Sequence, residues 1–520
     1  MWVTFVFRKV SRTLKRVIPL VIATGLLLGC VRPWGSTSIF DIPRTPERQP
    51  TPYVPVQPVS PTTSTEVMQE PVSMTPSPEI ENELPAGEQT NPKTYTVQPG
   101  DTLGNIARQF NVDLALLIAA NQLSNPDRID VGQELIIPVA EDFPQGPDFI
   151  IIPDSELVFG PSTTTFKMGT FVENQPGVLK DYHEDRNGES FSGTELIEKI
   201  SRDFSVNPRL LLAILEYQSG WVTKPSPPAE TRKYPVGYRG NEQITGLYHQ
   251  IGWAANMLNY GYYLWKAGGV KGWVLADQTY VLVPESINAG TAGVQYLFSL
   301  IYGKEEWMKA VGPQGVYATY ARLFGSPQAL AFEPLIPENL TQPEMILPFA
   351  PGTIWYFTGG PHPAFGTGSA WGALDFAPPG DAYGCYTSSD WVTAVADGVI
   401  VRSGDGAVVQ DLDGDGFEQT GWTVLYYHIA SSGRVSEGRY LKAGDDIGHP
   451  SCEGGVSNGT HLHIARRYNG EWISADGAIP FVLSGWISTG DGIPYEGRLI
   501  KGEQIVTAWD KRLNENQIGR

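Results

Sequence analysis

The spacing of hydrophobic and polar positions changes several times along the chain, and each change predicts a different kind of element. Residues 94–97 alternate as a strand does, and two stretches with helical spacing separate them from a second short strand at 135–138. From residue 194 to about 325 apolar residues recur at helical intervals, with Pro208 where a helix can begin. Beyond about residue 343 short strands alternate with Gly and Pro. The pattern predicts a multidomain protein with a small βααβ unit, a mostly α-helical middle domain and a C-terminal antiparallel all-β domain.

These changes of pattern also suggest where the parts of the chain begin and end. Residues rich in Pro, Thr, Ser and Glu precede the βααβ unit, and such a composition buries too little apolar surface to fold, so we expect a disordered tether. We divide the chain into a leader at 1–30, the tether at 31–93, the βααβ unit at 94–139, connecting strands and loops at 140–193, the helical domain at 194–340, the all-β domain at 341–508 and a tail at 509–520.

The leader has the features of an export signal. A basic region ending at Arg16 is followed by an apolar run, Val17 to Leu28, that is shorter than the roughly 20 residues of a membrane span. Gly29-Cys30 ends the run and resembles the lipobox of bacterial lipoproteins, which implies a lipid on Cys30. We therefore expect an extracytoplasmic protein that is lipid-anchored to a cell membrane, inner or outer. An uncleaved membrane anchor and a plain secretory signal are the alternatives.

Charge and cysteine content narrow the range of partners. The net charge of −19 and pI of about 4.8 exclude a nucleic-acid partner, because binding phosphates requires a basic face. Two cysteines besides Cys30 remain, Cys385 and Cys452. In an exported protein they can pair, which would add roughly 4 kcal/mol through loop closure. Two buried free thiols are the alternative.

The βααβ unit, TYTVQPGDTLGNIARQFNVDLALLIAANQLSNPDRIDVGQELIIPVA, resembles the LysM family over its whole length. That resemblance implies binding of N-acetylglucosamine-containing glycans, with peptidoglycan favoured over chitin. The family's sugar groove lies between the loop after the first strand and the loop before the second. The implied glycan-binding residues are Gly100, Asp101, Thr102, Asn125 and Ile129. These residues could instead only form turns and caps, and for Asp101 we favour a helix cap.

The helical domain resembles the core of lysozyme-like lytic transglycosylases. In that family a catalytic Glu precedes Ser-Gly, but here Gln218 precedes Ser219-Gly220, and glutamine cannot protonate a glycosidic oxygen. Glu216 lies about 200° around the helix from that position and cannot simply replace it. We expect a non-catalytic domain that binds or spaces. Residual glycan cleavage through Glu216 and an unrelated helical spacer remain the alternatives.

The stretch HLHIA in the all-β domain places two histidines on one side of a strand. Residues i and i+2 of a strand share a face, so His461 and His463 point one way while Leu462 and Ile464 point the other. Alone, such a pair is more often a solvated polar stripe than half of a metal site.

Further histidines in the same domain favour the metal site. His362 and Asp375 lie in glycine-rich and aromatic surroundings upstream, and His428 follows an aromatic strand. Singly, His362 suits a surface loop and His428 a core. Two histidines, one carboxylate and a water form a tetrahedral catalytic zinc site.

The motifs H-x12-D, YYHIA and HLHIA together resemble the M23 metallopeptidases, the LytM or lysostaphin-like family, with the long His-to-Asp spacing of the β-lytic branch. By that resemblance His362, Asp375 and His463 bind one zinc per chain. His428 and His461 would be the catalytic pair beside it.

An acidic run in the same domain resembles the start of a calcium loop. Asp411, Asp413 and Asp415 have the spacing of an EF-hand, but position twelve is Trp422 where a bidentate acid is needed. A polar hairpin turn is favoured, and a structural calcium is the alternative.

Together these features predict a surface-tethered cell-wall hydrolase. LysM would hold it to the glycan, and the zinc domain would cut stem or bridge peptides of peptidoglycan. The first alternative is a catalytically silent wall-binding protein that recruits or activates another hydrolase. A second is an enzyme directed at foreign protein or foreign walls, which the lipobox argues against.

Overall fold

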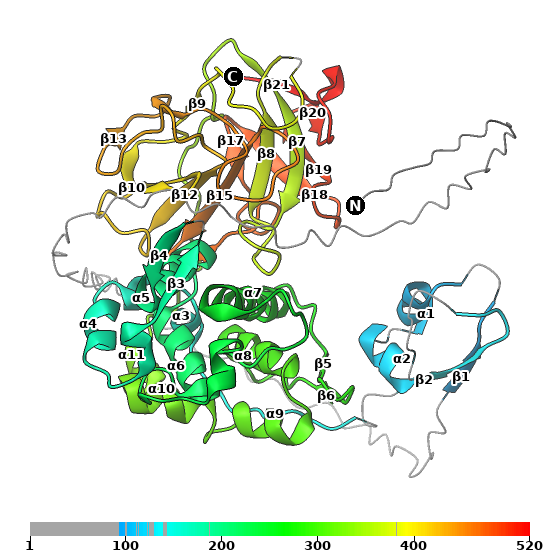
Figure 1. Ribbon diagram of the computed structural model, residues 1–520. Helices are drawn as coiled ribbons and strands as arrows, with labels where there is room; N and C mark the ends of the chain where they lie inside the picture. Colours follow the sequence, from blue (N-terminus) through cyan, green and yellow to red (C-terminus); the bar gives the residue numbers. More distant parts are fainter. Residues whose placement is uncertain are drawn as a thin grey trace, which may run out of the picture. The chain divides into compact units, whose positions relative to one another are not determined.

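The computed structural model describes residues 93–98, 101–110, 112, 114–121, 123, 129–138, 143–186, 188–380 and 382–520 (Figure 1). The predicted leader and tether, with Cys30, lie outside these residues. No helix among the described residues is long and apolar enough to cross a membrane. The predicted fold class is confirmed: a small α+β unit, a helical middle part and a C-terminal part built of antiparallel strands.

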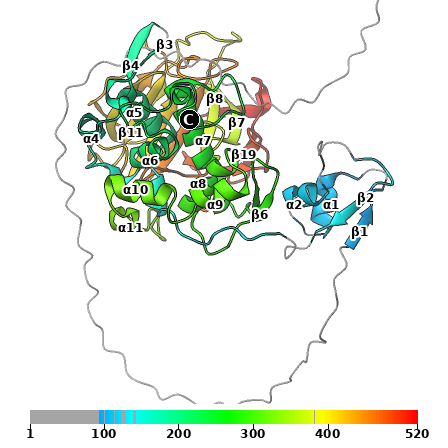
Figure 2. The ribbon, with the colours of Figure 1, turned by 60° about the horizontal axis from the view of Figure 1, so that its bottom comes forward.

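The first described unit has the predicted βααβ order. Strands β1 (Lys93–Thr96) and β2 (Glu134–Ile137) pair antiparallel, and helices α1 (Leu103–Phe110) and α2 (Leu114–Ala120) lie between them in the chain (Figure 2). Burial of one large apolar side chain contributes about 1.5–3 kcal/mol, which is how so small a unit can hold together. Its core consists of Val97, Leu103, Ile106, Ala107, Leu117, Leu135 and Ile137.

The middle part is organised around four longer helices. They are α5 (Gly193–Phe204), α6 (Pro208–Ser219), α7 (Gly246–Lys266) and α8 (Ala289–Ser299), and α7 lies against α8 in both ribbon views (Figures 1 and 2). The shorter helical elements are α3 (Asp154–Leu157), η2 (Pro161–Thr163), α4 (Met168–Glu173), η3 (Val178–Asp181), η4 (Ala229–Arg232), α9 (Lys304–Ala310), α10 (Val316–Phe324) and α11 (Pro327–Leu330).

Local sequence signals set where α5 and α6 begin. Ser192 and Glu195 form a capping box at the start of α5, in which each side chain accepts the other residue's backbone N–H. Asn207 caps α6 by accepting the Arg209 N–H, and Pro208 occupies the first helical position, where its missing N–H leaves no hydrogen bond unmade. Pro208 therefore begins a helix, as the pattern predicted.

The segment 143–193, expected as a connection, contributes to the helical core. Ile151, Ile152, Leu157 and Met168 are buried in the same apolar cluster as α5 to α8. Its apolar residues fall in short turns and single helical turns, so they show no sustained period in the sequence. Two small hairpins complete this part: β3 (His183–Arg186) with β4 (Glu189–Ser192), and β5 (Gly272–Val274) with β6 (Tyr280–Leu282).

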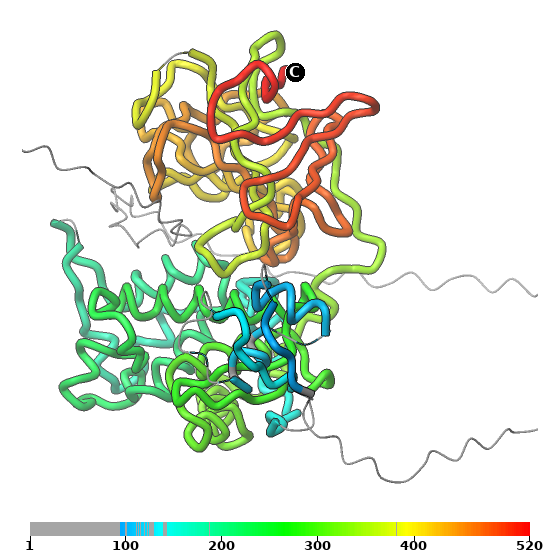
Figure 3. The backbone as a smooth tube through the Cα atoms, turned by 90° about the vertical axis from the view of Figure 1, so that its right-hand side faces the viewer, coloured from blue at the N-terminus to red at the C-terminus, as the bar shows by residue number. Residues whose placement is uncertain are grey.

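The C-terminal part contains a nine-stranded sheet with the order β13-β10-β11-β12-β15-β8-β7-β21, and β16 also pairs with β15. Figure 3 follows this backbone from yellow-green to red. The strands of this sheet are β7 (Ile354–His362), β8 (Ala373–Ala377), β10 (Gly398–Gly404), β11 (Ala407–Asp411), β12 (Trp422–Tyr427), β13 (Tyr440–Leu441), β15 (Leu462–Tyr468), β16 (Glu471–Trp472) and β21 (Gln517–Gly519). The remaining strands are β9 (Val392–Thr393), β14 (Asp446–Gly448), β17 (Val482–Leu483), β18 (Trp486–Gly490), β19 (Gly497–Lys501) and β20 (Gln504–Thr507), of which the last four form a separate sheet.

Side chains alternate between the two faces of β15, as the sequence predicted. Leu462 and Ile464 belong to the main apolar core of the C-terminal part. Ala465 belongs to a different apolar cluster on the opposite face, and His463 shares that face because it lies two residues away. The sheet therefore has one apolar core face and one face that carries the histidine.

The segment 509–520, expected as a tail, ends in a strand. β21 pairs antiparallel with β7, and Ile518 is buried in the main core. Three residues are too few to show an alternating pattern, so the sequence alone could not reveal this edge strand.

Helices α5 and α7 pack on the histidine-bearing face of the sheet. The Trp472 N–H donates to the Tyr263 hydroxyl at 2.9 Å, and the Trp472 indole N–H donates to the Phe204 carbonyl at 3.4 Å. The middle and C-terminal parts therefore share a structured interface.

Ion pairs at this interface are largely withdrawn from water. Lys199 of α5 pairs with Asp203 at 2.9 Å and with Asp405 of the β10–β11 turn at 2.5 Å. Arg402 pairs with Asp203 at 2.7 Å and with Glu418 at 3.2 Å. Each of these charges has an opposite partner, which offsets the cost of burying it.

Candidate metal centre

Three strands bring the predicted metal ligands together. His362 ends β7, Asp375 lies in β8 and His463 lies in β15, and these strands are neighbours in the sheet. His463 and Asp375 are directly opposite each other in the antiparallel register. The register of β7 against β8 shifts on either side of Gly359, and such irregularities re-aim a side chain. That shift brings His362, thirteen residues before Asp375 in the chain, to the same point.

A glycine makes room for the carboxylate. A Cβ atom at Gly359 would lie 2.9 Å from Asp375 Oδ2. That is closer than real Cβ contacts, so any side chain there would displace the carboxylate.

Hydrogen bonds to carbonyl oxygens set which ring nitrogens carry protons. His362 Nδ1 lies 2.8 Å from the Gly360 carbonyl, and His463 Nε2 lies 2.9 Å from the Ala364 carbonyl. A carbonyl can only accept, so both nitrogens are donors. In the neutral rings, His362 Nε2 and His463 Nδ1 then carry lone pairs, and they lie 3.0 Å apart. Asp375 Oδ1 is 3.3 Å from the first and 3.2 Å from the second. Three lone-pair atoms thus converge where a cation can bind.

The charge state of Asp375 suits a ligand. Burial would raise the pKa of this carboxyl, but positive charge on the neighbouring rings of His362 and His461 outweighs burial and holds the pKa well below its usual range, and a cation bound at this point would act in the same direction. The group is therefore an ionised carboxylate at neutral pH.

His428 and His461 lie beside these three residues. Their ring centroids are 4.6 Å apart, and His461 Nε2 is 3.6 Å from Asp375 Oδ1. The Nδ1 atoms donate to backbone carbonyls, His428 to Glu453 at 2.9 Å and His461 to Gly459 at 2.8 Å. This leaves Nε2 of each neutral ring free of its proton.

Backbone geometry and burial distinguish His428. Its φ of +64° is rare for a residue with a side chain, and the Ser451 N–H and hydroxyl hold the His428 carbonyl at 2.7 and 2.9 Å. Burial, followed by the neighbouring His461 and His463, lowers the pKa of His428 well below its usual value. The ring is therefore neutral at pH 7.

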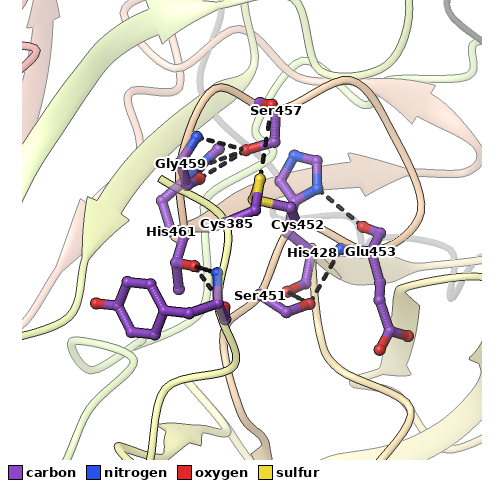
Figure 4. The surroundings of a disulfide bond; sticks show 10 residues. Cys385, His428, Ser451, Cys452, Glu453, Ser457, Gly459 and His461 are labelled. Atoms are coloured by element: carbon purple, nitrogen blue, oxygen red, sulfur yellow. Dashed lines mark hydrogen bonds between the residues drawn. A yellow bond between two sulfur atoms is a disulfide. The ribbon is translucent and has the colours of Figure 1, made fainter. Parts of the chain in front are cut away.

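The structure also joins the two cysteines. A disulfide links Cys385 and Cys452, whose Cα atoms are 5.6 Å apart (Figure 4). Figure 4 shows it among residues that contact His428 and His461.

One site residue was not anticipated. Tyr495 stacks on the ring of His362 with centroids 4.2 Å apart, at a φ of +73°. The Tyr495 N–H donates to Pro361 and its carbonyl accepts from Gly360. Tyr495 lies between β18 and β19, far from every histidine in the chain, and no motif marks it.

The acidic run at Asp411 forms a hydrogen-bonded turn. Asp411 accepts three backbone N–H groups, including that of Gly416 at 2.8 Å, and the Thr420 hydroxyl donates to Asp415 at 2.6 Å. Burial raises the pKa of Asp411 to about 7, with Asp413 adding to the shift. The carboxylate oxygens lie near one another, but nothing among the described residues favours calcium over this turn.

In the βααβ unit, Asp101 braces a turn and Thr102 caps α1. Asp101 Oδ2 accepts the Tyr95 hydroxyl and the Gln98 N–H, both at 2.7 Å, while Thr102 Oγ1 accepts the Asn105 N–H at 3.2 Å. The cap considered for Asp101 is therefore supplied by Thr102. Ile129 packs against the core, and Gly100 and Asn125 lie outside the described residues.

Glu216 in the helical domain has its carboxylate occupied. It accepts the backbone N–H groups of Val222 and Thr223, the Thr223 hydroxyl and the Arg322 guanidinium. Gln218 accepts a hydrogen bond from Tyr302. A carboxylate so fully bonded serves the fold, which argues against residual glycan cleavage through Glu216.

Comparison with known families identifies three domains. The LysM domain model matches residues 95–138, the model "LasA, N-terminal domain" matches residues 150–338, and the model "Peptidase family M23" matches residues 381–475. The M23 match includes His428, His461 and His463 but begins after His362 and Asp375. For the helical part the match is to the LasA N-terminal domain, where the sequence had suggested a lysozyme-like core.

Individual proteins are similar to different parts of this chain. "Protease LasA" of Pseudomonas aeruginosa (strain UCBPP-PA14) is 27% identical over 349 residues, covering 62% of this chain and 75% of the relative. "Secreted LysM effector ECP6" of Passalora fulva is 57% identical over 49 residues, covering 9% of this chain and 22% of the relative. The solved structure "A Novel M23 Metalloprotease Pseudoalterin from Deep-sea" is 25% identical and covers 35% of this chain and 99% of that chain, with a TM-score of 0.28.

The histidine-bearing sheet therefore belongs to a peptidase domain. More particularly, the chain carries a LysM domain, a LasA N-terminal domain and, in its C-terminal region, an M23-family peptidase domain, and its sequence is similar to that of the protease LasA.

Proposed function

We propose that this protein is a zinc-dependent endopeptidase that cleaves the peptide cross-bridges of peptidoglycan. The observation that carries the proposal is the convergence of lone pairs from His362, Asp375 and His463. Without a cation these atoms would repel one another at 3.0–3.3 Å. Two imidazole nitrogens and one carboxylate oxygen suit zinc, and a fourth position remains for water or substrate. Each histidine ligand also has the carbonyl partner that fixes its ring in zinc proteins.

A bound zinc would supply a Lewis acid for the scissile carbonyl and lower the pKa of water to about 7. The remaining chemistry falls to His428 and His461. Their Nε2 atoms can accept a proton as water adds to the peptide carbonyl, and a protonated ring can return it to the departing amine. Because both rings are held by carbonyls through Nδ1, they are oriented before substrate arrives.

The LysM domain supports the proposal that the enzyme binds to the glycan of a cell wall. Asp101 and Thr102 hold the loop after β1 in place, and Ile129 lies ahead of β2, so both loops of the family's groove contain described residues. A lipid on Cys30 would anchor the protein to a membrane on its extracytoplasmic side. The mass of the N-terminal peptide of the mature protein would test this lipidation.

The deciding experiment is digestion of peptidoglycan by the full chain, with bound zinc counted in the same preparation. The full chain is required because the middle domain packs on the peptidase sheet. New amines from the wild type, about one zinc per chain, and loss of both in His463→Ala would support the proposal. The masses of the fragments would identify the bond.

Two other results would point elsewhere. Bound zinc with no cleavage of walls of several cross-bridge types would favour a catalytically silent protein that recruits or activates another hydrolase. A wild-type chain without zinc would overturn the site itself.

A further inference from the structure

The Cys385–Cys452 disulfide connects two segments that are 67 residues apart in the chain. The segment around Cys452 bonds to His428, and the segment around Cys385 bonds to Thr460, the residue before His461. Cys385 is exposed and Cys452 is partly exposed, so a small reductant in solution can reach the bridge. Figure 4 shows the bridge between the residues that hold His428 and those that hold His461.

The residues on either side of Cys452 hold His428. Ser451 binds the His428 carbonyl through both its N–H and its hydroxyl, and the Glu453 carbonyl accepts from His428 Nδ1. His428 has a φ of +64°, which is unfavourable for a residue with a side chain, so these hydrogen bonds help to hold its backbone in that conformation. Moving Cys452 would therefore disturb both the backbone and the ring of His428.

The residues on either side of Cys385 hold the segment before His461. The Gly384 carbonyl accepts the Thr460 N–H at 3.0 Å, and Thr460 Oγ1 accepts the Tyr386 N–H at 2.9 Å. Thr460 immediately precedes His461, which also forms an isolated β-bridge with Ser451. The Cys452 segment thus contacts both histidines, and the Cys385 segment holds the residue that precedes His461.

The metal ligands are held differently. His362, Asp375 and His463 lie on β7, β8 and β15, which are paired by sheet hydrogen bonds that do not involve either cysteine. A change at the disulfide should consequently reach His428 and His461 and leave the ligands in place.

We propose that the Cys385–Cys452 disulfide is a redox-sensitive clamp that positions His428 and His461, so that its reduction lowers catalysis while the metal stays bound. The inference rests on the proposed roles of these two histidines. A phosphine would cleave the S–S bond: the two sulfurs gain two electrons and two protons and become thiols, while the phosphine takes oxygen from water and becomes its oxide.

The test compares oxidised and phosphine-reduced full chain, with thiols and zinc counted in each. A phosphine has no thiolate to compete for zinc. We expect kcat to fall at least about tenfold with KM little changed, because loss of a positioned acid–base group costs about 10²- to 10⁴-fold. Zinc should remain bound, and reoxidation should restore kcat. The Cys385→Ser/Cys452→Ser double variant should have the reduced kcat and no response to phosphine.

A matched control separates positioning from general loss of stability. Leu441→Ala removes a core side chain from β13, at the far edge of the sheet, and should lower the melting temperature while keeping kcat. Full reduction with unchanged kcat would overturn the clamp, and so would loss of zinc on reduction.

The ring resonances of the histidines make the test independent of turnover. If the oxidised wild type binds zinc but cleaves nothing, the proposed function fails. The ring resonances still test whether the disulfide positions His428 and His461. Movement of the His428 and His461 signals on reduction, with those of His362 and His463 unchanged, supports the clamp. No movement overturns it.

Discussion

His362 Nε2 and His463 Nδ1 face each other at 3.0 Å, and the second nitrogen of each ring donates to a backbone carbonyl. Neither ring can turn its facing nitrogen away without losing that bond. The two rings therefore require a cation or a shared proton between them.

The first prediction concerns metal removal. Chelation should lower the melting temperature of the wild type, because zinc at about a thousand times its Kd stabilises the folded state by about 4 kcal/mol. His463→Ala should not respond to chelation. His449→Ala is the matched control, since that ring packs against Trp391 and bonds to the Asp390 carbonyl, so its loss should leave the response intact. An equal response in His463→Ala would contradict the assigned ligands.

The second prediction separates the catalytic pair from the ligands. His461→Ala and His428→Asn should lower kcat by about 10²- to 10⁴-fold while zinc content stays near that of the wild type. Asparagine is chosen at 428 because it tolerates a positive φ better than alanine does. Metal analysis beside cleavage rates checks this, and loss of zinc in both variants would assign the pair to the metal instead.

The third prediction concerns acid stability of the domain interface. Burial alone would raise the pKa of Asp203 and of Glu418, but Lys199 and Arg402 outweigh it at Asp203, and Arg402 and Arg467 outweigh it at Glu418. Both folded-state pKa values are lowered. Their stabilisation is thus fully present above the unfolded values of about 3.9 and 4.3 and is lost as the pH falls through the folded values.

Thermal unfolding of Asp203→Asn against pH tests this. The variant should be less stable at pH 7 by about 3 kcal/mol, because Lys199 and Arg402 each lose a buried partner. Its stability should also depend less on pH below about 4 than that of the wild type. Parallel pH curves for both proteins would show that Asp203 carries no such linkage.

The fourth prediction concerns Glu216. Glu216→Ala should destabilise the protein by about 1–3 kcal/mol, since it leaves the buried backbone N–H of Val222 and the partly buried one of Thr223 without their acceptor. The rate of peptide cleavage should be the same as that of the wild type, and so should any release of sugar ends from the glycan. Exposed Glu242→Ala serves as the control. If Glu216→Ala released fewer sugar ends than the wild type, the carboxylate would have a catalytic role and the prediction would be wrong.

The alternation in β15 shows what the sequence could predict. A strand period of two is local, so the common face of His461 and His463, and the burial of Leu462 and Ile464, follow from five residues. The helix that starts at Pro208 is similarly local, because the proline fixes its own φ.

Features that depend on distant residues could not be predicted this way. The direction in which the His362 side chain points depends on a register shift opposite Asp375. The contact of Tyr495 with His362 depends on a turn from another sheet. The carbonyl partners of His428 and His461 likewise depend on backbone positions that no side-chain pattern records. The residue types in the sequence therefore indicated a metal site. The tautomers and orientations of its histidine rings could be assigned only from the folded structure.

Strand β15 also limits the footprint of a substrate. His463 stands at its start, and Ala465, the next residue on that face, is already buried beneath the cluster that includes Tyr263 of α7. Two residues of strand span only about 7 Å. A peptide that reaches the centre therefore finds little open sheet in the direction of Ala465, and the side chains of its residues on that side have little of β15 to contact.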